Sequence, residues 1–144
     1  MIAICDEAID VQAACRAVRT DGFGSLVVFQ GVVRGTGARG QPVRELYYET
    51  YREIALAEME AIADEVRARW MPCAVAIVHR IGTLHIAEVS VVVAIATPHR
   101  APGFEACAYA IEQLKRRAAI WKQERYADGS TSWLDGAVPS GVRF

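Results

Sequence analysis

The most constraining feature of the sequence is an almost unbroken apolar run from Val89 to Ala96. A run of this length and β-branched content is typical of a strand at the centre of a sheet that is buried on both faces. Pro98 then biases Thr97 towards an extended conformation, so the chain is expected to leave the sheet where His99 and Arg100 appear. The run, together with 53% hydrophobic residues, predicts an α/β or α+β protein.

Hydrophobic periodicity predicts the elements around this strand. Two longer helices are expected, over residues 52–70 and about 101–118, because apolar residues recur there at three- and four-residue steps. A shorter helix capped by Asp6 or Asp10 is expected to run to Val18. Alternating or apolar segments predict the strands, at residues 2–5, 25–34, 43–50, 73–82, from 120 onwards and at 131–134.

The length of 144 residues predicts one domain over 1–144, with a loosely held tail at 135–144. A formal net charge of −1 excludes a strongly basic nucleic-acid-binding protein. The four cysteines contain no C-x-x-C pair, which gives no sign of a zinc or redox motif. No apolar run approaches the length of a membrane span and no leader is evident, so a cytoplasmic location is expected.

The cationic residues suggest where chemistry takes place. Lys115 and Lys122 are the only lysines, whereas every other permanently basic residue is arginine. This contrast indicates either a need for amine chemistry or a compositional bias, and Lys115 could equally be a lysine that lays its stem along an apolar helix face. Strand ends tend to converge on one crevice, so Arg34, His99 and Arg100 are expected to join these lysines in an anion site. Positive neighbours would lower a lysine pKa there towards neutrality.

Other schemes have less support. The sequence has no phosphate-binding P-loop, no dinucleotide fingerprint and no serine nucleophile elbow. His79 lies within an apolar strand, where a satisfied structural histidine is the simpler interpretation, and His85 is placed in a turn. The glycine-containing segment 35–40 is interpreted as a flexible loop.

Five motifs occur in order along the chain, and together they resemble one family, the catalytic (large) subunit of molybdopterin synthase. They are Phe29-Gln-Gly-Val-Val-Arg34, Tyr48-Glu-Thr-Tyr51, His79-Arg-Ile-Gly82, His99-Arg100 with Phe104-Glu-Ala106, and Leu114-Lys115 followed by Ile120-Trp-Lys-Gln-Glu124. The resemblance implies an α/β hammerhead-type fold with an additional antiparallel β subdomain. It also implies a homodimer that binds two small ubiquitin-like sulfur carriers, forming a heterotetramer.

By the same resemblance, the Gly-Gly tail of each carrier ends in a thiocarboxylate, and its sulfur is transferred to cyclic pyranopterin monophosphate to form the molybdopterin dithiolene. Neither metal nor other cofactor is implied. Lys115 matches the lysine beside the terminal glycine carbonyl, and Lys122 the second essential lysine. The implied substrate-binding set is Val32, Val33, Arg34, His99, Arg100, Lys115, Lys122, Gln123 and Glu124.

The chain departs from the family pattern at Ala87, often glycine, and at Ala119, often proline. Neither change removes a functional group. The alternative that remains open is a non-catalytic, anion- or carrier-binding dimeric homologue. It differs from a sulfurtransferase in binding the carrier without turnover.

Overall fold

The computed structural model describes residues 1–134, so the prediction for the tail 135–144 lies outside the described residues. The predicted central strand is confirmed as β6 (Val89–Thr97). It lies between β4 (Ala74–Arg80) and β2 (Ser25–Val32) in a first sheet of order β1-β4-β6-β2, with β1 (Ile2–Cys5) at one edge. In this sheet β1 and β4 run parallel, whereas β4 and β6, and β6 and β2, run antiparallel.

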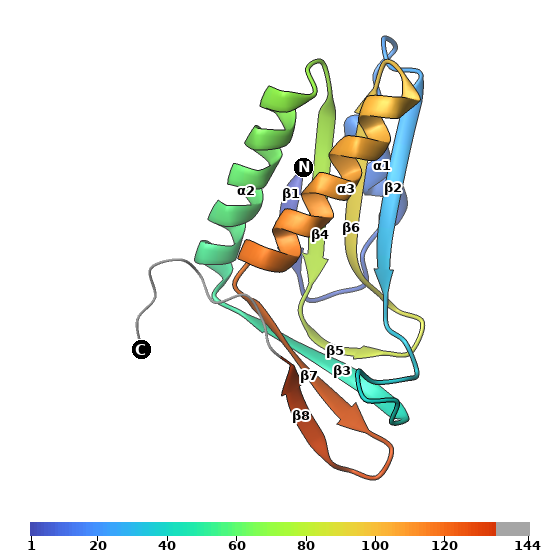
Figure 1. Cartoon of the computed structure of the whole chain (residues 1–144), viewed down its shortest axis with the longest axis vertical. Coiled ribbons are helices and arrows are strands. Elements are labelled where there is room, and N and C mark those ends of the chain that lie inside the picture. The colour runs from blue at the N-terminus through green and yellow to red at the C-terminus, as the bar shows by residue number, and fades with distance from the viewer. Residues whose placement is uncertain (135–144) are drawn as a thin grey trace.

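Helices cover both faces of this first sheet (Figure 1). α1 (Val11–Val18) packs on β4 and β6 from one side, while α2 (Arg52–Arg69) and α3 (Arg100–Arg117) cover the other side. The alternation of each strand divides the core accordingly. Val91, Val93 and Ile95 of β6 face α2 and α3, whereas Val92 and Ala94 face α1.

A second, antiparallel sheet lies across the end of the first (Figure 1). Its order is β5-β3-β7-β8, formed by β5 (Gly82–His85), β3 (Val43–Thr50), β7 (Ile120–Tyr126) and β8 (Thr131–Leu134). It has a small core of its own, made of Val33, Val43, Leu46, Leu84 and Tyr126. The expected α+β class with an additional antiparallel sheet is therefore confirmed.

Two details differ from the sequence-based expectations, and one pair of alternatives is decided. Gly82–His85 forms β5 rather than a turn, because the segment pairs with β3, far away in the sequence. Asp10, not Asp6, caps α1, and its carboxylate accepts the backbone N–H of Ala13 at 2.9 Å. β2 ends at Val32, where the register against β6 shifts, so Arg34 lies beyond the strand. None of the helices within residues 1–134 is long and apolar enough to cross a membrane.

Candidate functional site

A cavity of about 590 Å³ opens where the first sheet, the end of α3 and the second sheet meet. We call it the junction cavity. It is lined by Phe29, Gln30, Gly31, Val32, Arg34, Tyr48, His79, Ser90, Val91, Ile111, Leu114, Lys115, Ala118, Ile120 and Lys122. Residues from β2, β3, β4, β6, α3 and β7 thus converge on one space.

Three of the predicted cationic residues meet in this cavity. Arg34 follows β2, Lys115 lies in the last turn of α3, and Lys122 lies on β7. The C-terminal end of a helix carries partial negative charge, which favours a cation at the position of Lys115. The predicted convergence of both lysines with Arg34 is confirmed.

Burial lowers the pKa of the Lys122 amine from its ordinary value, because a half-buried ammonium loses hydration. The positive charges of Lys115 and Arg34 act in the same direction. The carboxylate of Glu124 opposes them but does not outweigh them. The lowered pKa makes the Lys122 amine easier to deprotonate than an ordinary lysine.

Glu124 lies two residues after Lys122, on the same face of β7. Its carboxylate is buried, accepting the backbone N–H of Ala38 at 3.1 Å and the hydroxyl of Tyr126 at 2.7 Å. A side chain at Gly37 would come within 2.7 Å of this carboxylate, so the loop needs glycine there. Glu124 therefore anchors the 35–40 segment beside the cavity.

Two further predicted residues direct their side chains away from the cavity. Gln123 points to the other face of β7, where its Oε1 accepts the Nε–H of Arg125 at 3.1 Å. Val33 is buried in the small core of the second sheet, whereas its neighbour Val32 lines the cavity.

The prediction that His99 and Arg100 join the lysines in one crevice is wrong for a single copy of the chain. His99 stands at the N-cap position of α3 without a side-chain capping bond, and Arg100 begins the helix. Lys115 lies near the opposite end of its 18 residues. At 1.5 Å per residue, about 22 Å of helix separates Arg100 from Lys115. The helix that follows β6 carries the chain back along the whole sheet, so its two ends cannot share one cavity.

A neutral polar wall of the cavity was not predicted. His79 is only 7% exposed and its Nδ1 lies 2.8 Å from the carbonyl oxygen of Arg80. Burial lowers the pKa of His79 to about 4, so the imidazole is neutral at pH 7. Tyr48 packs edge-on against it, with 5.3 Å between ring centroids. Both residues belong to motifs noted above, but only the tertiary structure places them together.

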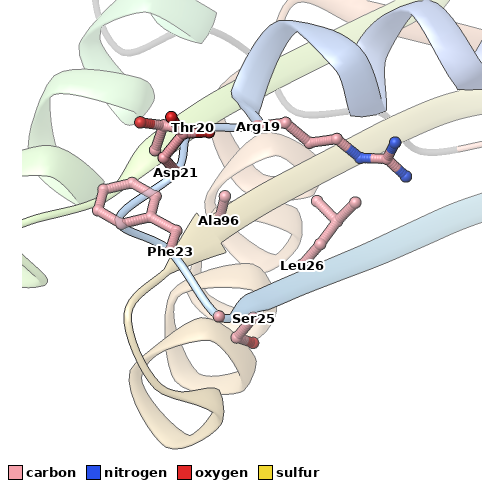
Figure 2. A pocket seen from close by; sticks show the side chains of 8 residues that line it. Arg19, Thr20, Asp21, Phe23, Ser25, Leu26 and Ala96 are labelled. Carbon is pink, nitrogen blue, oxygen red and sulfur yellow. The ribbon is translucent and has the colours of Figure 1, made fainter.

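A second hollow of about 420 Å³ lies at the other end of β2 (Figure 2). Arg19 and Asp21 place opposite charges on its rim, and the Arg19 side chain extends past Leu26, away from Asp21. This hollow is formed by residues 19–21, residues 23–26 and Ala96. These residues do not bring together a group of like charges as the junction cavity does. Across residues 1–134, no cluster of His, Cys, Asp or Glu is arranged to hold a metal ion.

Comparison with known proteins places these features in context. The profile of the family described as MoaE protein matches residues 4–117. The molybdopterin synthase catalytic subunit of a Nostoc species is 45% identical over 112 residues, covering 77% of this chain and 67% of that protein. The subunit of the same name from Halalkalibacterium halodurans is 38% identical, covering 94% and 92%. The crystal structure of molybdopterin synthase from Staphylococcus aureus is similar with a TM-score of 0.87 and 34% identity, covering 92% and 95%.

Proposed function

Since the chain belongs to the MoaE family of molybdopterin synthase catalytic subunits, it is an enzyme of molybdenum cofactor biosynthesis, and we propose that its reaction is a sulfur transfer. The sulfur donor is the C-terminal thiocarboxylate of a small ubiquitin-like carrier protein. The acceptor is cyclic pyranopterin monophosphate, which becomes the dithiolene of molybdopterin. The observation that carries this proposal is the convergence of Arg34, Lys115 and Lys122 on one cavity.

The charge of the cavity suits the two reactants. A thiocarboxylate and a phosphorylated pterin are both anions and repel each other, and three cations around one space offset that repulsion. Lys115 would lie beside the terminal glycine carbonyl of the carrier. Lys122, with its lowered pKa, would exchange a proton with the reacting groups.

The separation of His99 and Arg100 from this cavity fits a site built from two copies of the chain. The resemblance assigns both residues to the substrate, yet one copy holds them at the far end of α3 from Lys115. A two-fold symmetric dimer can bring the start of one α3 to the end of the other. We therefore propose a homodimer in which each cavity receives His99 and Arg100 from the second copy, with one carrier bound to each subunit.

Reconstitution tests the proposed function. The purified chain is mixed with thiocarboxylated carrier and cyclic pterin, and dithiolene formation is followed over time. Replacement of Lys115 by alanine is expected to reduce the initial rate by at least about 100-fold, the scale of a lost general acid–base or charge-stabilising group. Arg116→Ala, one residue further and paired with Glu112 on the helix surface, is the matched control. An undiminished rate in Lys115→Ala would remove this lysine from the reaction.

The alternative, a non-catalytic carrier-binding homologue, is not supported by the relatives, which are named catalytic subunits. That alternative predicts a cavity in which Arg34 and Lys115 are not joined by His99, as in a single copy. The reconstitution assay separates the two functions. Stable carrier binding with no dithiolene formed, under conditions where a catalytic subunit from another source is active, would support the alternative.

A further inference from the structure

The junction cavity has two chemically different walls. Arg34, Lys115 and Lys122 form a cationic wall, whereas His79 and Tyr48 form a neutral one. His79 lies on the same face of β4 as Val75 and Ile77, whose side chains pack under the helices. The polar imidazole ring thus follows two apolar side chains at the point where this face of the strand reaches the cavity.

The hydrogen-bonding direction at His79 is fixed by its partner. A carbonyl oxygen can only accept, so the hydrogen of the neutral imidazole lies on Nδ1 and is donated to Arg80. The other nitrogen, Nε2, is then an acceptor, and no residue within 1–134 is bonded to it. Every fully buried side-chain nitrogen or oxygen in that range has a partner. Nε2 therefore keeps accessible surface, and the space that His79 faces is the cavity.

Tyr48 stands beside His79 on this wall, with 5.3 Å between the ring centroids. Burial raises the pKa of Tyr48, so its hydroxyl is protonated at pH 7 and can both donate and accept. The Ser90 hydroxyl, which also lines the cavity, donates its one hydrogen to the carbonyl oxygen of Gly31 at 3.2 Å. The neutral wall therefore offers one acceptor of fixed direction, His79 Nε2, and one hydroxyl group, that of Tyr48.

We propose that His79 Nε2 accepts a hydrogen bond from an N–H group of the pterin's pyrimidine ring, that the Tyr48 hydroxyl bonds the same ring, and that the two residues so orient the substrate. This inference rests on the proposed function. In a pyranopterin phosphate, the N–H-bearing ring and the phosphate lie at opposite ends of a fused ring system. The neutral wall would hold the first, and the cations would hold the second.

The Gly-Gly tail of the carrier also has N–H groups, but it fits the neutral wall less well. The last glycine nitrogen is only two bonds from the terminal carbonyl carbon. Wherever the cations hold the thiocarboxylate, this N–H is held beside them. The neutral wall is therefore assigned to the pterin.

Binding measurements on the full chain test the assignment. Tyr48→Phe removes one oxygen and is expected to weaken cyclic pterin binding about twofold to tenfold, as for one hydrogen bond. His79→Phe is the second variant, and the two effects are independent readouts if one variant fails to fold. Tyr109→Phe is the matched control, because its hydroxyl bonds Glu65 between α2 and α3, outside the cavity. Calorimetry measures the affinity of each variant for the cyclic pterin, for inorganic phosphate and for the carrier.

The expected pattern is a loss confined to the pterin, with phosphate and carrier affinities unchanged in all variants. An unaltered pterin affinity in Tyr48→Phe would overturn the assignment, and so would a loss confined to the carrier. The wild-type chain distinguishes this failure from that of the proposed function. If it forms dithiolene while Tyr48→Phe binds pterin normally, only the orientation by the neutral wall is wrong.

Discussion

At the scale of single residues, the site depends on how neighbouring groups change one amine. Lys122 is half-buried, close to two cations and to the Glu124 carboxylate, and the balance lowers its pKa. Sequence alone could indicate that the two lysines are unusual, because they are the only ones among so many arginines. It could not indicate which of them is buried, since that depends on the packing of β7 against the end of α3.

The balance at Lys122 predicts opposite shifts for two substitutions. Glu124→Gln removes the group that raises the pKa of Lys122, so that pKa should fall further. Lys115→Gln removes a cation that lowers it, so the pKa should rise. Lysine-selective NMR can follow both titrations, because the wild-type chain gives only two side-chain amine signals. Glu112→Gln, on the exposed face of α3, is the control. If Glu124→Gln and Lys115→Gln shifted the pKa of Lys122 in the same direction, the proposed balance of charges would be wrong.

The neutral His79 predicts a specific acid sensitivity of the fold. Its pKa is about 4 in the folded chain and near 6.5 when unfolded, so between these values only the unfolded chain takes up the proton. This contribution to stability is intact above about pH 6.5 and is lost as the pH falls towards 4, by up to about 1.4 kcal/mol per pH unit. The free energy of unfolding, measured in urea at a series of pH values, should therefore fall less steeply between pH 6.5 and 4 for His79→Phe than for the wild type.

At the scale of elements, periodicity was sufficient for most of the fold. The unbroken run at Val89 predicted the central strand, and the three- and four-residue steps after Arg52 predicted α2. β5 was missed because four residues carry no usable period and the strand exists only by pairing with β3. The misplacement of His99 had a different cause. An 18-residue helix is too long for its two ends to meet, a length argument that the sequence already contained.

The packing of α3 on the sheet depends on one close approach. A side-chain carbon at Gly103 would come within 2.9 Å of Thr97 Oγ1 and 3.2 Å of Val27 Cγ2. Gly103→Ala should therefore destabilise the fold by about 1 to 3 kcal/mol, although alanine favours helix. Denaturant unfolding measures the effect. Gly22→Ala, where the added carbon meets nothing within 4 Å, is the matched control and should be close to neutral.

At the scale of the whole molecule, the two-copy site makes a prediction that no single-copy site shares. Lys115→Ala and Arg100→Ala should each abolish most of the activity alone. Mixed and allowed to exchange subunits, they should recover about a quarter of the wild-type sites, because half of the dimers are mixed and each has one intact cavity. The dithiolene assay gives the yield. No recovery, despite proven exchange, would place both residues in the same subunit's site or outside it.

Several whole-molecule expectations stay predictions. They include the single domain over 1–144, the cytoplasmic location and the roles of the individual substrate-binding residues. Composition and motif order were informative about the family because they depend on the chain alone. A dimer interface could not be predicted in this way, because hydrophobic periodicity shows which residues face the core of one chain but not which surface contacts a second copy.

The Glu124 carboxylate has a consequence for how the cavity is assembled. It joins Ala38 and β7 across 86 positions of the chain, and it is also the nearest counter-charge to the Lys122 amine. Any displacement of the glycine-containing segment that broke the bond to Ala38 would leave this anion freer to pair with the amine. The proton affinity of the amine would then rise. Backbone geometry on one side of the cavity and basicity on the other are thus linked through a single shared side chain.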